Sequence, residues 1–411
     1  MEVQPRGYKK VIQLIDKGAN IPNPSSLHIG DEVDLSRVSA KGLTIYPGCR
    51  IYGEKTAIAP GATLGAEGPV TIDDCALGPK VELKGGYFRQ SVYLAEASVG
   101  PSAQVREGCL LEEYASVAHC VGLKQTILFP FVTVGSLVNF CDCLMAGGSG
   151  PTDHSEVGSS YVHFNFTPDG DKATPSLFGD VARGVMLREP AIFLGGQGGA
   201  VGPVTVNYGA VVAAGSILRE DVDEECQLVC APVPRAIKRE RTAFTRKNVG
   251  HVVRSNVRYL ANLAALEEWY RVVRHVFFAR EEMGEILYGA ALDTFTLAMR
   301  ERANRLQGMV DRAAEAGAAE KRLSARVNEV CSMFGADRAS NLGAEGEAFL
   351  ASLLAASAES GGGYVQAIQS LDADVSSKGS QWMKTVVEGF RSEAETVLGL
   401  ADSGDTDGSA G

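Results

Sequence analysis

Aliphatic residues recur every six positions through the first half of the chain. The clearest run is Val99, Val105, Leu111, Val117, Leu123 and Phe129. A small or aliphatic residue follows four positions after each of the first five: Ala103, Cys109, Ala115, Val121 and Ile127. A period of six fits neither the 3.6 residues of a helical turn nor the two-residue alternation of a strand. It is typical of a triangular parallel β-helix, in which each hexad forms one side and three hexads complete a coil.

The hexads extend in both directions from this run. The upstream positions are Ile45, Cys49, Ile51, Ile58, Ala62 and Leu64, and the downstream ones are Leu194, Ala200, Val206, Val212 and Leu218 with Ala210, Ser216 and Val222. The phase is lost between about 145 and 193. Insertions in solenoids gather on one face, often the binding face. We therefore predict an N-terminal segment at 1–26 and a β-helix at 27–225 with an ejected loop at 145–193.

Helical spacing replaces the hexads after about residue 246. Apolar residues then recur at three or four positions: Val253, Val257, Leu260, Leu263, Leu266, Tyr270, Val273 and Val276. Gly and Ser clusters near 335–345, 359–363 and 376–380 predict breaks that divide five or six helices. An all-α domain is expected at 226–400, followed by a disordered polar tail at 401–411.

One stretch inside the phase loss, "HFNFTPDGDKATPSLFGD" at 163–180, concentrates polar residues. Pro168 and Pro175 cannot donate to a sheet ladder, so the segment cannot continue the coils unbroken. Gly170 permits a tight turn. This pattern predicts a loop that leaves the column and covers a substrate.

Composition narrows the function classes. A net charge of −11 argues against a nucleic-acid partner, and no apolar run is long enough to predict a membrane span. The first residues lack the apolar core of a signal peptide, so a cytoplasmic location is expected. Nine cysteines in such a chain are expected to be free thiols. The pairs Cys141 with Cys143 and Cys226 with Cys230 have the spacing of metal ligands, but cysteines elsewhere fill small slots of the repeat, and no metal site is predicted.

The hexads resemble those of the left-handed β-helix (hexapeptide-repeat) superfamily of acyltransferases. The segment 200–222, "AVGPVTVNYGAVVAAGSILREDV", is similar to the acetyltransferase half of the bifunctional N-acetylglucosamine-1-phosphate uridyltransferase and glucosamine-1-phosphate acetyltransferase. That half carries a raised loop with Asn-Tyr-Asp-Gly, then Lys, then Ile-Gly-Asp. The matching residues are Asn165, Phe166, Asp169, Gly170, Lys172, Phe178, Gly179 and Asp180. The resemblance spans roughly 40–225 and implies the left-handed sense.

Three departures from the family pattern stand out. The interval from Asn165 to Lys172 holds one extra residue. The segment with the family's catalytic His is shorter, so His154 in "PTDHSEVG" matches it approximately. No Gly-rich nucleotide loop with a following Arg precedes the hexads, so the uridyltransferase (pyrophosphorylase) domain is expected to be absent. The helical part matches no family.

The resemblance implies transfer of an acetyl group from acetyl-CoA to the amine of a sugar. A His would act as general base, and backbone N–H groups would stabilise the oxyanion. Two candidates for the base are His154 and His163, which otherwise cap loop backbone. The implied substrate-binding residues are Asn165, Asp169, Lys172 and Asp180. Their alternative roles are solvated ion pairs or an Asx-turn.

Gly196 and Ala214 match the family's acetyl-CoA contacts. They lie in or near "FLGGQGG" at 193–199, whose four glycines suggest that something approaches the backbone closely. Either a pantetheine arm or a neighbouring subunit would fit. The resemblance also implies a homotrimer with sites between neighbouring helices.

The leading hypothesis is a CoA-dependent N-acyltransferase acting on an amino-sugar phosphate or nucleotide sugar, as in the UDP-N-acetylglucosamine pathway. The alternatives are a non-catalytic scaffold or sugar-nucleotide binding module, and a partner subunit of a separate nucleotidyltransferase. A basic segment at 235–258 is either a solvated face or a docking site for an acidic partner. Its basic residues are Arg235, Lys238, Arg239, Arg241, Arg246, Lys247, Arg254 and Arg258.

Overall fold

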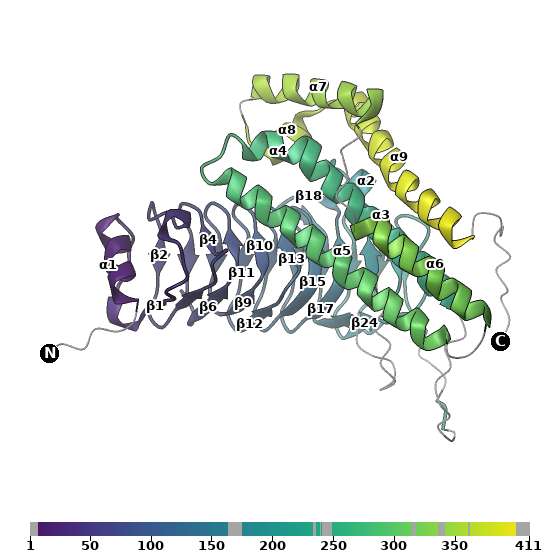
Figure 1. Cartoon of the computed structure of the whole chain (residues 1–411), viewed down its shortest axis with the longest axis horizontal. Helices are drawn as coiled ribbons and strands as arrows, with labels where there is room; N and C mark the ends of the chain where they lie inside the picture. The colour runs from purple at the N-terminus through teal and green to yellow at the C-terminus, as the bar shows by residue number, and fades with distance from the viewer. Residues whose placement is uncertain are drawn as a thin grey trace.

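A parallel β-helix with three flat faces forms the first half of the protein, and helices lie along it (Figure 1). The computed structural model describes residues 7–162, 175–232, 236–238, 240, 249–314, 318–335, 342–360 and 362–399. Paired strands lie 18 residues apart in sequence, as in Ser91 with Cys109 and Ser98 with Ser116. Three hexads therefore complete one coil, which confirms the predicted parallel β-helix.

Face 1 is a continuous sheet of ten strands. In stacking order they are β2 (Thr44–Ile45), β5 (Thr63–Leu64), β8 (Glu82–Leu83), β11 (Ser98–Val99), β14 (Ser116–Val117), β16 (Thr133–Val134), β20 (Glu156–Val157), β23 (Phe193–Leu194), β26 (Val211–Val212) and β28 (Leu228–Val229).

Faces 2 and 3 are joined by two long strands, β15 (Gly122–Leu128) and β17 (Asn139–Met145), which each run along both faces. Face 2 also holds β1 (His28–Ile29), β3 (Arg50–Tyr52), β6 (Val70–Asp73), β9 (Gly86–Arg89), β12 (Ala103–Val105), β21 (Ser160–Val162), β24 (Gly198–Ala200) and β27 (Ile217–Leu218). Face 3 also holds β4 (Ala57–Ile58), β7 (Ala76–Leu77), β10 (Ser91–Tyr93), β13 (Cys109–Leu111), β22 (Ser176–Phe178) and β25 (Thr205–Val206).

The corners are made by left-handed residues. β15 and β17 turn from face 2 to face 3 at Gln125 (φ 52°) and Asp142 (φ 57°). Tyr114 (φ 62°) and Phe131 (φ 70°) turn successive coils toward face 1. The coil repeats this otherwise uncommon conformation because each side is only a few residues long. The predicted inward residues are buried: Val105 and Leu111 are 0% exposed, and Val117 is 3% exposed.

The segment 145–193 differs from the single ejected loop that was predicted. β20, β21 and β22 lie within it and pair with the coils on either side. Two insertions leave the column at the corner that precedes face 1. The first is a hairpin of β18 (Gly148–Gly150) and β19 (Asp153–His154), and the second holds the short helix α2 (Val181–Gly184). The six-residue period could not be recognised between 145 and 193 because the insertions interrupt the short strands there.

Helix α1 (Tyr8–Asp16) closes the first coil of the solenoid (Figure 1). Its Val11 and Leu14 are fully buried. The Lys10 ammonium donates to the carbonyls of Gly30, Asp31 and Val33 at 2.6–3.0 Å. Two short 3₁₀ segments, η1 (Pro24–Ser26) and η2 (Leu35–Arg37), follow in the first coils.

The C-terminal part is helical, which confirms the predicted all-α fold class, but the last strand of the solenoid, β28, lies inside the range 226–400 that was predicted to be all-α. Its elements are α3 (Val249–Trp269), the π-helical turn η3 (Tyr270–Arg274), α4 (His275–Phe278), α5 (Gly284–Ala314), α6 (Ala318–Gly335), α7 (Gly343–Ser360), α8 (Tyr364–Ser370) and α9 (Ala373–Leu398). The breaks predicted near 335–345 and 359–363 are present. The break predicted at 376–380 is wrong, because α9 continues through it. A side chain at Gly379 would meet Phe349 and Met186 at 2.4–2.6 Å, so this glycine permits close packing rather than ending a helix.

The helices cover face 3 of the solenoid. α5 packs on β7, β10 and β13, and α3 packs on β22. Figure 1 shows α5 running along the solenoid. Face 3 is therefore buried on both sides. Its outward row is apolar and consists of Ala57, Ala76, Val92, Leu110, Ile127, Leu144 and Leu177.

Candidate functional site

Face 1 changes character along the column. Its outward side chains are polar in the first seven strands, from Thr44 to Glu156. In the last three strands they become Phe193, Val211 and Leu228, which are 39%, 40% and 72% exposed. These three stand in register on adjacent strands. This surface, the apolar end of face 1, is bordered by the two corners that carry the predicted site residues.

His154 lies at the corner that precedes face 1, at the end of the β18–β19 hairpin. Gly148 pairs with His154 across the hairpin, and a side chain at Gly148 would lie 2.5 Å from the His154 Cα. The Ser155 hydroxyl, directly after the hairpin, donates to the Ala146 carbonyl at 2.8 Å and accepts the Ile192 N–H at 2.8 Å. The base of the hairpin is thereby tied to two neighbouring segments.

The hydrogen bond of His154 fixes its tautomer. Nδ1 lies 2.9 Å from the Pro151 carbonyl oxygen. A carbonyl oxygen can only accept, so Nδ1 carries the hydrogen and donates it. The neutral imidazole then keeps an unprotonated Nε2, the atom that a general base needs. The His154 residue as a whole is partly exposed.

Asp180 lies at the same corner, in the insertion from the next coil. Its carboxylate accepts the Arg183 backbone N–H at 2.9 Å and caps α2. Burial raises the pKa of Asp180 above its ordinary value. Its backbone N–H donates to the Tyr208 hydroxyl at 3.0 Å, and that hydroxyl donates to the Asp180 carbonyl at 2.6 Å. These contacts give Asp180 a structural role in the corner.

Sequence reasoning missed the charged partner of this corner, Arg183. Its guanidinium pairs with Glu189 and Glu225 and lies 4.8 Å from the centre of the Tyr208 ring. The only sequence signal is its position three residues after the capping Asp180. Glu189 lies six residues after Arg183 in the same insertion, whereas Glu225 comes from a later coil, 42 residues away in sequence.

Gly196 and Ala214 lie at the other corner, which follows face 1. Gly196 accepts the Gly215 N–H at 2.9 Å from the next coil. A side chain at Gly195 would lie 2.4 Å from the Ala214 nitrogen, and one at Gly198 would lie 2.3 Å from the Ser216 carbonyl oxygen. The stacked coil itself is therefore what approaches Gly195 and Gly198, and neither a pantetheine arm nor a subunit is needed to explain these two. A side chain at Gly196 would make only ordinary contacts, with the Ser159 nitrogen nearest at 3.4 Å.

Within one chain, the predicted catalytic and substrate-binding residues that the structure describes do not contact the residues predicted to bind acetyl-CoA. His154 and Asp180 share one corner, whereas Gly196 and Ala214 share the next. Gly158, which lies against Gly196, is four positions after His154. At about 3.3 Å per residue the separation is roughly 13 Å, along β20, the strand next to the apolar end of face 1. His163, Asn165, Asp169 and Lys172 lie outside the described residues.

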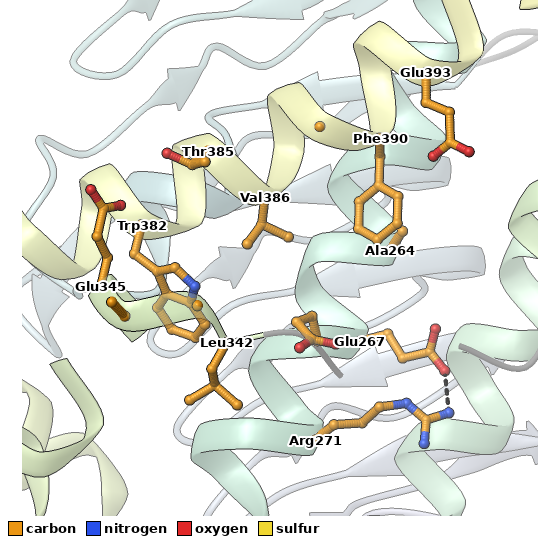
Figure 2. A pocket seen from close by; sticks show the side chains of 14 residues that line it. Ala264, Glu267, Arg271, Leu342, Glu345, Trp382, Thr385, Val386, Phe390 and Glu393 are labelled. Carbon is orange, nitrogen blue, oxygen red and sulfur yellow. Dashed lines mark hydrogen bonds and ion pairs between the residues drawn. The ribbon is translucent and has the colours of Figure 1, made fainter. Parts of the chain in front are cut away.

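A cavity of about 750 Å³ lies in the helical half, between α3, α7 and α9 (Figure 2). Its walls combine the aromatic rings of Trp382 and Phe390 with carboxylates. One of these, Glu267, is paired with Arg271 at 2.7 Å. None of the predicted site residues that the structure describes, His154, Asp180, Gly196 and Ala214, lines this cavity, so it is separate from the described part of the face 1 site.

Part of the basic segment 235–258 lies outside the described residues. Within the described part, Arg258 is engaged by the solenoid: it donates to the Thr205 hydroxyl at 3.1 Å and lies 3.6 Å from Asp221. This residue therefore contributes to the packing of α3 on the last coils.

All nine cysteines are free thiols. No cluster of three or more His, Cys, Asp or Glu suited to a metal ion occurs among the described residues. None of the helices in the described ranges is long and apolar enough to cross a membrane.

Comparison with known proteins gives a consistent set of relatives. The chain is 27% identical to the bifunctional protein GlmU of Thermotoga maritima over 215 residues, which are 52% of this chain and 42% of the relative. GlmU of Trichlorobacter lovleyi is 28% identical over 228 residues, covering 55% and 44%. GlmU of Kineococcus radiotolerans is 29% identical over 206 residues, covering 50% and 37%.

The matched region is thus less than half the length of these relatives. The chain matches no family model. The relatives and the coil register agree with each other: the chain is a hexapeptide-repeat solenoid protein related to the bifunctional GlmU proteins.

Proposed function

We propose that the protein is a CoA-dependent N-acyltransferase that acetylates an amino-sugar phosphate or nucleotide sugar at the apolar end of face 1. The observation that carries the proposal is the hydrogen bond from His154 Nδ1 to the Pro151 carbonyl. It leaves Nε2 as a basic atom beside a solenoid face, in a chain related to GlmU. The other predicted roles, those of Asn165, Asp169 and Lys172 toward the sugar phosphate, remain part of this proposal.

The chemistry requires one proton acceptor. The substrate amine attacks the thioester carbonyl of acetyl-CoA and forms the C–N bond. Nε2 of His154 takes the proton that the amine loses. The tetrahedral intermediate then breaks its C–S bond, and the CoA thiolate leaves with the proton that His154 returns. An amide and free CoA result, and no further reactant is needed.

The same proposal includes a homotrimer. Face 3 is covered by the helices of the chain itself, so a partner copy would use the remaining faces. The exposed row of Phe193, Val211 and Leu228 supports this arrangement because exposed apolar rows mark interaction sites. A partner there would also bridge the roughly 13 Å between the two corners. Light scattering that gives a monomer mass would exclude a site shared between copies.

The experiment is a turnover assay with acetyl-CoA and a panel of amino sugars that includes glucosamine 1-phosphate. His154→Ala and His163→Ala are compared with His28→Ala, which lies in the first coil at the far end of the column. His154→Ala, which lacks the proposed base, should lose roughly 10²–10⁴-fold in rate, and His28→Ala should keep the full rate. Full turnover in His154→Ala would overturn its assignment as the base, and full turnover in His163→Ala as well would exclude both candidates. Absence of both turnover and CoA binding in the parent would favour a non-catalytic binding module.

A further inference from the structure

The hairpin that carries His154 is connected to the helical half. The side-chain amide of Gln369, at the end of α8, donates to the Ser149 carbonyl at 2.6 Å. Ser149 lies in β18, the strand opposite His154. This contact joins residues 220 positions apart in sequence.

A second set of contacts closes the connection into a ring. Arg188, in the insertion that follows α2, donates to the Gln369 carbonyl at 2.9 Å and also to the Leu371 carbonyl. The next residue, Glu189, accepts the Gly148 N–H at 2.8 Å. The end of α8 therefore contacts both the 188–189 segment and strand β18, and these two segments also contact each other.

The hairpin needs such support. Each of its strands is two or three residues long, and an isolated two-stranded hairpin is marginally stable in water. Inside it, the Ser149 hydroxyl donates to the Asp153 carboxylate at 2.6 Å. The backbone of Gly148 lies directly against His154, so a movement of β18 displaces the imidazole.

Helix α8 itself is firmly placed. Ala367 and Ile368 are fully buried. The Tyr364 hydroxyl accepts the Trp269 indole N–H at 2.9 Å, and the Arg274 guanidinium lies 3.8 Å from the centre of the Tyr364 ring. α8 therefore presents Gln369 from a rigid base.

From this ring of contacts we propose that α8 positions His154 for proton transfer, with Gln369 and Arg188 as positioning residues. The inference rests on the proposed function of His154 as the base. It gives the helical half a role in the reaction, because Gln369 fixes the strand opposite His154 without touching the substrate.

The test replaces the amide donor by an isosteric group that cannot donate. Gln369→Glu places a carboxylate next to the Ser149 carbonyl, and Gln366→Glu makes the same charge change at an exposed position of the same helix. Hydrogen exchange of the full-length protein is followed by mass spectrometry in peptides that cover 147–155. Loss of one hydrogen bond predicts exchange faster by about threefold to tenfold in Gln369→Glu and unchanged exchange in Gln366→Glu.

Turnover provides the second readout. Gln369→Glu should lower kcat for acetyl transfer by a similar factor and leave the KM for acetyl-CoA unchanged, because binding groups at the other corner are intact. Unchanged exchange in Gln369→Glu would show that Gln369 does not stabilise the β18–β19 hairpin. Faster exchange with unchanged kcat would overturn the positioning role. If the parent has no turnover, the proposed function fails, and the exchange data still decide whether α8 holds the hairpin.

Discussion

Glu112 shows how a single buried residue ties the two halves together. It lies after β13 and is 3% exposed. The Tyr270 hydroxyl donates to its carboxyl group, and the neighbouring Glu113 accepts two hydrogen bonds from Arg274 at 2.6 and 3.1 Å. Burial raises the pKa of Glu112 to about 7, and the Arg274 guanidinium opposes this rise without reversing it. The protein therefore holds a neutral carboxyl group at the interface below pH 7.

This raised pKa predicts a pH-dependent stability. A carboxyl group with a higher pKa in the folded state binds more protons there than in the unfolded chain. Stability should then fall as pH rises from about 4.5 to about 7, by roughly 2–3 kcal/mol. Glu112→Gln, which cannot ionise, should flatten this slope. Urea unfolding at several pH values measures the difference between the two proteins. Equal slopes would show that Glu112 does not change its protonation in this range.

At the scale of elements, the inward hexad residues predicted the β-helix because they alone set its period. The site was only partly predictable. His154 could be placed beside an insertion, but its hydrogen bond to Pro151 depends on how the hairpin folds back. The covered face 3 does have a sequence signal: consecutive apolar residues, as in Cys109–Leu111 and Cys143–Met145, indicate strands buried on both sides.

The glycines could not be interpreted from sequence, because a helix break, a ligand approach and a close stacking contact all favour the same residue. The structure assigns Gly195 to stacking, since the next coil lies where a side chain would go. Gly195→Ala should therefore destabilise the last coils and lower the melting temperature by several degrees, as expected for an overpacked site costing about 1–3 kcal/mol.

Gly68→Ala is the matched control within the solenoid, because no atom lies within 4 Å of the added Cβ. It should leave the melting temperature nearly unchanged or raise it slightly. Differential scanning calorimetry compares the two variants. Equal melting temperatures would show that the coils can move apart to accept a side chain at Gly195.

At the scale of the whole molecule, the helical half acts as the cover of face 3. The row that includes Val92, Leu110, Ile127 and Leu144 would be exposed without it. Charged pairs, such as Arg302 with Asp142 at 2.6 Å, fix the cover along its length. The helices are therefore part of the solenoid's own stability.

A chain shortened to residues 1–232 should bind the dye ANS and aggregate, since each uncovered Val or Leu side chain loses roughly 1.5–3 kcal/mol of burial. Replacing Val92, Leu110, Ile127 and Leu144 by Thr, the residue type found outward on face 1, should restore solubility. Size-exclusion chromatography follows both proteins. A monodisperse shortened chain without ANS binding would contradict the role of the helices as a cover.

The most direct test of the proposed acyl transfer is calorimetry of acetyl-CoA binding to the full chain. Ala214 is exposed at the corner that follows face 1, and Ala66 is an exposed alanine in an early coil. We expect one acetyl-CoA bound per chain in the parent and in Ala66→Trp. In Ala214→Trp, where the indole occupies the binding corner, the affinity should be at least about tenfold weaker. No heat of binding in the parent, or equal affinity in both Trp variants, would contradict acetyl-CoA binding at the apolar end of face 1.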